Sequence, residues 1–172
     1  YRNPTHRLKE VIKHMDSLVA DAMKYGHQSL PEVVAKDFTP QNVKISVVGV
    51  GGGGSNTVTR LHKMGIKSAE TIAVNTDQKH LQMVEADKRL LIGASFTKGQ
   101  GAGGFPEVGM KAAEQARDKF AEVLSGSELV FICAGMGGGT GTGAAPVIAE
   151  VAKKQGAIVV AMVTYPFALE PA

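Results

Sequence analysis

The chain has 172 residues, 44% of them hydrophobic and 20% charged, with a formal net charge of +3. This balance is typical of one folded globular domain and excludes a disordered chain. The single cysteine excludes an internal disulfide bond and fits a reducing compartment such as the cytoplasm. Glycine is the unusual residue, because it fills 21 positions against a usual share of about 7%.

Residues 1–42 are expected to form an amphipathic helix followed by a connector. Apolar side chains from Leu8 to Met23 recur every three or four positions, which is the spacing of one helical face. Thr5 suits the start of this helix and Gly26 its end. Its polar face carries both signs of charge, which favours packing on protein over lying on a membrane. Packing on its own domain and on a neighbouring molecule both remain open.

From residue 43 onward, short apolar runs rich in Val and Ile alternate with segments of helical periodicity. Continuous apolar strands separated by helices are typical of a parallel sheet that is buried on both faces. We therefore predict an α/β, Rossmann-like, doubly wound and mostly parallel sheet, preceded by the N-terminal amphipathic helix. The expected strands are residues 43–48, 71–74, 90–92, 129–134 and 157–163, and the expected helices are residues 55–64, about 80–84, 106–123 and 142–155.

The uncharged run over residues 129–149 has the length of a membrane span. It contains six glycines and almost no large apolar side chain at its centre, so a strand, a loop and a helix start are favoured instead. No basic-then-apolar signal segment opens the chain at Tyr1. The largest basic clusters are the pairs 88–89 and 153–154, too small for a nucleic-acid interface. We expect a cytoplasmic protein without direct membrane insertion and without a nucleic-acid partner.

Fifteen of the 21 glycines fall in three stretches, 49–54, 99–104 and 135–143. All three precede predicted helices, and the first and third directly follow predicted strands. Glycine lets successive backbone N–H groups turn toward one point, and a helix start adds unpaired donors with a partial positive charge. An ordinary turn needs one glycine, so tight turns or close helix–sheet contacts explain these runs poorly. We expect the three stretches to bind a di- or triphosphate.

Residues 49–54 also satisfy the dinucleotide pattern G-x-G-x-x-G, with Asp77 placed 23 residues beyond Gly54. A glycine-rich run satisfies this pattern easily, so it leaves a nicotinamide-dependent dehydrogenase open as an alternative. The P-loop pattern is absent here, because Ser55 and Asn56 stand where that motif needs Lys and then Ser or Thr.

The seven residues Gly-Gly-Gly-Thr-Gly-Thr-Gly at 137–143 are identified as the signature of the tubulin/FtsZ family of GTPases. The chain resembles the FtsZ branch of this family from about residue 43 to residue 170. The resemblance implies a GTP-binding domain of a cytoskeletal GTPase that binds GTP or GDP with Mg²⁺. It also implies head-to-tail homopolymers, or protofilaments, at the division site of the cell. A nucleotide sensor without hydrolysis remains a third reading. The motifs that carry the resemblance are GVGGGGSN (49–56), NTD (75–77), GQGAGG (99–104) and PFALE (166–170).

The resemblance further implies which residues bind the nucleotide. The glycine stretches would hold the phosphates, while Asn56 and residues 75–77 would add polar contacts and help to place Mg²⁺. Thr140 and Thr142 suit phosphate oxygens as short hydroxyl donors, and Glu170 would meet the ribose. The full expected set is Gly51, Gly52, Gly53, Ser55, Asn56, Asn75, Asp77, Gly101, Ala102, Gly103, Gly104, Gly138, Gly139, Thr140, Gly141, Thr142, Gly143 and Glu170.

In this family a second half of the chain carries the base-reading helix and an acidic loop that activates water on the neighbouring subunit. We expect no catalytic residue and no separate metal site within residues 1–172, and the domain division is 1–42 and 43–172. The fragment should therefore bind nucleotide with little turnover. Membrane-tethering division proteins are partners that the family implies. Lys79, Phe105 and Pro171 depart from the family pattern and leave open a divergent paralogue.

Overall fold

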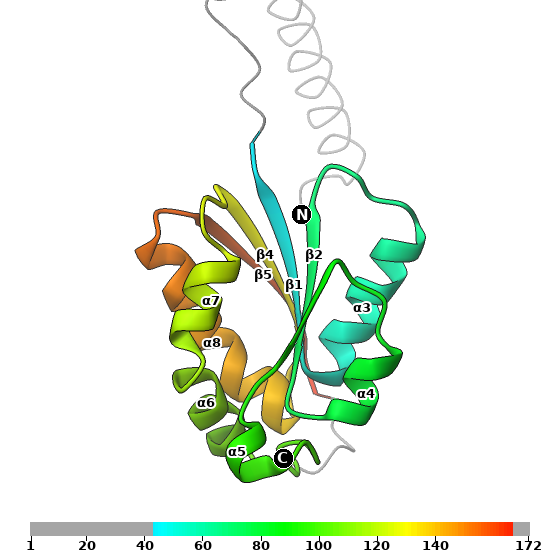
Figure 1. The fold of residues 1–172 in the computed structure, drawn as a ribbon, viewed down its shortest axis with the longest axis vertical. Helices are drawn as coiled ribbons and strands as arrows, with labels where there is room; N and C mark the ends of the chain where they lie inside the picture. Colours follow the sequence, from blue (N-terminus) through cyan, green and yellow to red (C-terminus); the bar gives the residue numbers. More distant parts are fainter. Residues whose placement is uncertain (1–42, 167–172) are drawn as a thin grey trace, which may run out of the picture. The chain divides into compact units, whose positions relative to one another are not determined.

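Five parallel strands form one sheet in the order β3-β2-β1-β4-β5 within residues 43–166, the part of the chain that the computed structural model describes (Figure 1). This confirms the predicted α/β, Rossmann-like parallel sheet. The helix expected within residues 1–42 lies outside the described residues. The strands are β1 (Ile45–Val50), β2 (Glu70–Asn75), β3 (Lys88–Leu91), β4 (Leu129–Gly135) and β5 (Ile158–Thr164). The helices are α3 (Gly51–Lys63), α4 (Gln78–Met83), α5 (Ala94–Thr97), α6 (Pro106–Glu114), α7 (Arg117–Val123) and α8 (Gly139–Lys154).

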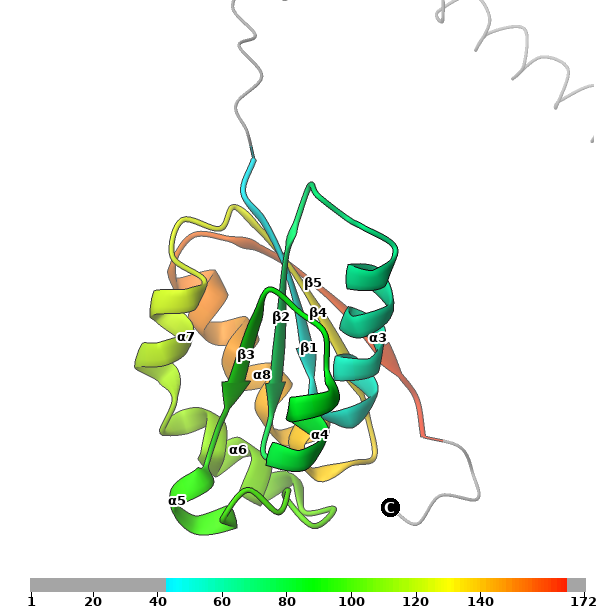
Figure 2. The same cartoon turned by 45° about the vertical axis from the view of Figure 1, so that its right-hand side comes forward.

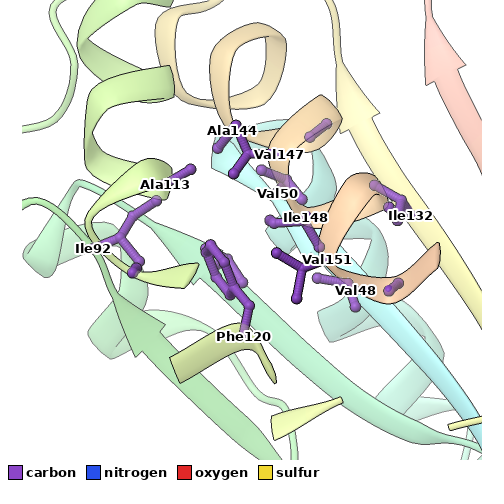
Figure 3. Close-up of a cluster of buried hydrophobic side chains, with 14 of the residues drawn as sticks. Val48, Val50, Ile92, Ala113, Phe120, Ile132, Ala144, Val147, Ile148 and Val151 are labelled. Atoms are coloured by element: carbon purple, nitrogen blue, oxygen red, sulfur yellow. The ribbon is translucent and has the colours of Figure 1, made fainter. Parts of the chain in front are cut away.

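Helices cover both faces of the sheet: α3 and α4 lie on one face, and α6, α7 and α8 lie on the other (Figures 1 and 2). Side chains alternate along a strand, so each strand feeds both layers. Val48 and Val50 of β1 point into the larger core, where they meet Ile148 of α8 and Phe120 of α7 (Figure 3). Val47 belongs to a smaller cluster on the α3 face. The carboxyl ends of the central strands are thereby held rigidly in place.

The helices α3 and α8 begin at Gly51 and Gly139, several residues before the expected starts at 55 and 142. Glycine has a low helix propensity, so a pattern-based boundary stops short of it. Here the glycines form the first helical turns because the chain passes from strand to helix without a long loop. The first and third glycine stretches are therefore largely helix starts.

The single helix expected over residues 106–123 is two helices, α6 and α7, separated at Gln115 and Ala116. The Ala116 N–H donates to the carbonyl of Ala113 at 3.0 Å, which tightens the chain into one short turn. The turn lets Arg117 at the start of α7 pair with Glu150 on α8, while Phe120 stays in the core. Tertiary packing outweighs local periodicity at this break.

Strand β5 is an edge strand of the sheet, and its side chains are largely exposed, contrary to the expectation of burial on both faces. Ile158 and Met162 are 69% and 60% exposed. The prediction was wrong because the same continuous run of apolar residues occurs both in strands that are covered on both faces and in edge strands. Among residues 43–166, nothing pairs with the outer edge of β5. The opposite edge strand, β3, has only four residues and begins with Lys88 and Arg89.

At the amino end of the sheet, Asp87 is joined to Thr71, the second residue of β2. One carboxylate oxygen of Asp87 accepts hydrogen bonds from the Thr71 hydroxyl and backbone N–H, both at 2.7 Å. The Thr71 hydroxyl, followed by its backbone N–H, holds the pKa of Asp87 below its ordinary value. His62 lies 3.7 Å from the other carboxylate oxygen. The ionised form of Asp87 therefore ties the segment before β3 to β2.

We expect Asp87→Asn to lower the free energy of unfolding at neutral pH by about 1 kcal/mol, because the carboxylate is half-exposed and its hydrogen bonds are partly screened. The pKa of Asp87 is lower in the folded chain, so its contribution is present above pH about 4 and is lost as the pH falls through the folded pKa. Urea unfolding at several pH values measures the difference between the two proteins. Glu85→Gln, which breaks the exposed pair with Lys63, is the control and should change stability less. A difference that persists unchanged well below pH 4 would contradict the assignment.

Candidate functional site

A groove of about 470 Å³ opens where the carboxyl ends of β1 and β4 lie side by side. The chain winds from β1 toward β2 and β3 on one side and returns to β4 and β5 on the other. Ligands of doubly wound sheets bind at this switch in strand order. The groove is lined by the end of β1 with the start of α3, and by the segment that joins β4 to α8: residues 50–53 and 135–141.

The starts of α3 and α8 meet at this groove. A Cβ atom on Gly51 would lie 2.9 Å from the backbone nitrogen of Gly141, so the two first turns are in contact. Neither helix has a side-chain hydrogen bond at its N-cap, Val50 or Gly138, and neither has an acidic residue in its first turn. Two helix starts with uncapped N–H groups therefore face one groove, and their dipoles both favour an anion.

The glycines of the first and third stretches serve two different purposes. A Cβ atom on Gly54 would overlap the carbonyl oxygen of Cys133, and one on Gly143 would overlap that of Pro106. These glycines allow backbones to touch, so the expectation that close packing would not explain the runs was wrong for them. By contrast, a Cβ atom on Gly52 or Gly138 would meet nothing within 4 Å. These open glycines leave the groove free for a ligand. Gly49, Gly139 and Gly141 are also packed too closely against backbone to carry a side chain.

The second glycine stretch lies beside the start of α8 but does not line the groove. The Gln78 N–H donates to the Gly99 carbonyl at 2.9 Å, and the Gly101 N–H donates to the Thr76 carbonyl at 3.1 Å, so the segment is fixed to the end of β2. Its four glycines all have positive φ values, from 61° to 88°. The Ala102 side chain would contact a Cβ atom on Gly139 at 2.8 Å. Phosphate contacts from Gly101, Ala102, Gly103 and Gly104 remain a prediction.

Asn75 and Asp77 lie at the carboxyl end of β2, as expected, but part of their hydrogen-bonding capacity is used internally. The Asn75 side-chain oxygen accepts from the backbone N–H groups of Thr76 at 2.8 Å and of Asp77 at 3.3 Å. One Asp77 oxygen caps α4 by accepting from the His80 N–H at 3.0 Å. The other Asp77 oxygen has no hydrogen-bond partner within residues 43–166. Asp77 therefore retains one oxygen for a ligand.

Two of the expected contact residues, Ser55 and Asn56, lie away from the groove. Ser55 is fully buried on α3, and its hydroxyl has no hydrogen-bond partner among the described residues. Asn56 is exposed on α3 and does not line the groove. Glu170 lies outside the described residues. The nucleotide contacts expected of these three residues are not tested by the geometry.

The threonines of the third stretch have different neighbours. Thr140 lines the groove and is 8% exposed. The Thr142 hydroxyl accepts from the Gly137 N–H at 3.0 Å, so it closes the loop before α8. Thr76 belongs to the range 75–77 from which polar contacts are expected, and its hydroxyl oxygen is 2.7 Å from that of Thr140. Sequence reasoning missed this pairing, because the two residues are 64 positions apart along the chain.

The described residues contain no group of three or more His, Cys, Asp or Glu side chains that could hold a metal ion. Mg²⁺ in nucleotide sites is commonly held by one or two carboxylates together with phosphates. Asp77 has an open carboxylate oxygen of this kind at the end of β2, but it is not among the residues that line the groove. Within the same residues, no helix has the length and apolarity that a membrane crossing requires.

A parallel sheet with two uncapped helix starts at its switch point defines the class of α/β domains that bind phosphorylated ligands. The model of the tubulin/FtsZ family, GTPase domain, matches residues 44–171. The chain belongs to the tubulin/FtsZ family. Because the family match includes residues 49–54, this glycine stretch is part of a GTPase domain, and the dehydrogenase alternative is not supported.

The relatives point to the FtsZ branch. The chain is 62% identical over 129 residues to cell division protein FtsZ 2 of Methanocaldococcus jannaschii, covering 75% of this chain and 34% of that protein. It is 55% identical over 161 residues to FtsZ 2 of Haloferax volcanii, covering 92% of this chain and 40% of that protein. The chain thus spans about a third to two-fifths of these relatives.

Solved structures agree with the fold. An empty FtsZ dimer from M. jannaschii matches with a TM-score of 0.75 and 47% identity, covering 83% of this chain and 42% of that one. A GTPγS-bound protofilament of CetZ2 from H. volcanii matches with a TM-score of 0.63 and 30% identity, covering 70% of this chain and 39% of that one.

Proposed function

We propose that this chain supplies the GTP-binding part of a cell-division GTPase of the FtsZ type, which polymerises head to tail at the division site in the cytoplasm. The observation that carries the proposal is the convergence of the α3 and α8 starts on one groove without side-chain caps. The FtsZ relatives, which are named as cell division proteins, support the biological setting. The CetZ2 structure, titled as a GTPγS-bound protofilament, supports a nucleotide-bound polymer.

In this proposal, backbone N–H groups of residues 51–53 and 138–141 hold the phosphates, and the Thr140 hydroxyl donates a further hydrogen bond. Hydrogen bonds to a charged group contribute about 1.5–3 kcal/mol each, so four or five of them give roughly 6–15 kcal/mol gross, a range that includes the roughly 8 kcal/mol of a micromolar ligand. The open Asp77 oxygen would help to hold Mg²⁺ together with the phosphates. These residues bind and orient the nucleotide, while the acidic group that activates water comes from the second half of the neighbouring subunit in the polymer.

This division of labour predicts binding with little hydrolysis by the 172-residue chain itself. The protofilament and any membrane-tethering partner belong to the longer protein. A nucleotide sensor without hydrolysis shares the same groove and differs only in the behaviour of that longer protein. Light scattering of the longer protein with GTP separates the two, because only the polymerising GTPase assembles and then disassembles as GTP is consumed.

One titration tests the proposal. GTP, GDP, ATP and NAD are titrated separately against the chain by isothermal calorimetry, with Mg²⁺ and then with excess EDTA. We expect the guanine nucleotides to bind in the micromolar range, as estimated above, and GTP to lose affinity when Mg²⁺ is removed. Preferential binding of NAD would support the dehydrogenase instead. Phosphate release measured in parallel should stay near the uncatalysed rate, and rapid turnover by this chain would contradict the proposed division of labour.

A further inference from the structure

The hydroxyl groups of Thr76 and Thr140 form a buried pair that connects the end of β2 with the first turn of α8. Their oxygen atoms are 2.7 Å apart. Thr76 is fully buried, whereas Thr140 is 8% exposed and lines the groove. Within residues 43–166 neither hydroxyl has a second hydrogen-bond partner. One of the two hydrogens therefore lies between the oxygens, and the other is left over.

Burial decides which hydrogen is left over. If Thr140 donated to Thr76, the Thr76 hydrogen would be buried without an acceptor, which costs the desolvation of that group. If Thr76 donates to Thr140, the remaining hydrogen belongs to Thr140, which reaches the groove. The second arrangement satisfies the buried donor and leaves the free one where a ligand or water can accept it. Thr76 is therefore the donor of the pair.

We infer that Thr76 is a positioning residue for the nucleotide site, because its hydroxyl holds the Thr140 hydroxyl as a donor directed at a phosphate oxygen. This inference rests on the proposed function. A phosphate oxygen offers only lone pairs, so it needs such a donor. Without Thr76, the Thr140 hydroxyl near the start of α8 is free to rotate toward a backbone carbonyl, as threonine does in helices.

The backbone of Thr76 is fixed as well. Its N–H donates to the Asn75 side-chain oxygen at 2.8 Å, and its carbonyl accepts from the Gly101 N–H at 3.1 Å. Thr76 thus connects the end of β2 both with the second glycine stretch and with the first turn of α8. Because both backbone groups are engaged and the side chain is fully buried, the Thr76 hydroxyl is held beside that of Thr140.

The first test compares Thr76→Val, which keeps the side-chain shape and removes the hydroxyl, with Thr76→Ser, which keeps the hydroxyl. GDP is titrated against the 172-residue chain by calorimetry. We expect the valine variant to bind GDP about tenfold more weakly and the serine variant to stay within about twofold of the unmodified chain. Thr71→Val is the matched control, because Thr71 is a buried threonine whose hydroxyl is hydrogen-bonded at the amino end of the sheet. It should lower thermal stability and leave GDP affinity unchanged.

The second test is a double-mutant cycle with Thr140→Val, because a merely structural role of Thr76 would not pass through Thr140. We expect the double variant to bind GDP within about twofold of Thr140→Val alone, since Thr76 acts through that hydroxyl. Two results would overturn the inference while the proposed function stands. One is a double variant in which the fold-losses of GDP affinity of the two single variants multiply, and the other is a Thr76→Val protein with unchanged GDP affinity. If the unmodified chain binds no guanine nucleotide, the proposed function fails and the inference fails with it.

Discussion

Gly143→Ala is expected to lower the free energy of unfolding by about 3 kcal/mol or more, which is a large fraction of the roughly 5–15 kcal/mol that stabilises a domain. An added Cβ atom would overlap the carbonyl oxygen of Pro106 and lie 2.5 Å from the backbone nitrogen of Met110, at the crossing of α8 and α6. Both atoms belong to backbone, so no rotation of a side chain can relieve the overlap. The helix α6 would have to move away from α8, and the core between them would open. Urea unfolding followed by circular dichroism measures the change.

Gly52→Ala is the matched control for that substitution. Gly52 also lies in a helix, α3, but a Cβ atom there would meet nothing within 4 Å. Alanine has the higher helix propensity, so this variant should keep or slightly raise the stability of the chain. If Gly143→Ala proved as stable as Gly52→Ala, the backbone contact between α6 and α8 would be wrong.

Gly138→Asp is expected to change stability and nucleotide binding in opposite directions. Gly138 is the N-cap residue of α8, with φ −89° and ψ 168°, a conformation open to any residue, and there is free space for a Cβ atom. An aspartate there caps α8 and favours its dipole, so the free energy of unfolding should rise by about 0.5–1 kcal/mol. The same carboxylate would share the groove with the proposed phosphates, and like charges about 5 Å apart near a protein surface repel by about 3 kcal/mol, so GDP affinity should fall about 100-fold.

Gly138→Asn separates the effect of the negative charge from the effect of filling the groove with a side chain. Asparagine caps a helix about as well as aspartate but is uncharged. It should raise stability similarly and weaken GDP binding less than aspartate does. Thermal unfolding without nucleotide and calorimetric titration with GDP give the two quantities. An aspartate variant that binds GDP as tightly as the unmodified chain would show that the phosphates do not lie at the start of α8.

Much of the fold could be predicted from the sequence, because apolar periodicity is a local property. The five strands and their order along the chain follow from short runs of Val and Ile, and Phe120 lies in the core as its spacing indicates. The starts of α3 and α8 could not be placed, because glycine hides a helical turn from any propensity argument. The exposure of β5 could not be predicted either, because it depends on which elements lie beside the strand.

The site was predicted in part. The glycine stretches and the class of ligand could be predicted, because consecutive glycines are read directly from the sequence and expose backbone N–H groups that bind phosphate. The division between Gly54, which packs on Cys133, and Gly52, which faces open space, depends on residues about 80 positions apart and needs the tertiary structure. Gly109, outside the three stretches, packs against the Gly139 carbonyl for the same reason. The hydroxyl pair of Thr76 and Thr140 is a further contact of this kind.

The two edge strands of the sheet differ in their ability to pair with another strand. Strand β3 is four residues long and begins with two cationic side chains, features that discourage strand addition. Strand β5 is seven residues long, its side chains are mostly apolar and exposed, and a groove of about 570 Å³ runs from β5 toward α3. A hydrogen-bonding template of this length invites continuation of the sheet. Among residues 43–166, the sheet is therefore asymmetric: β5 offers a long unpaired backbone edge, whereas β3 does not.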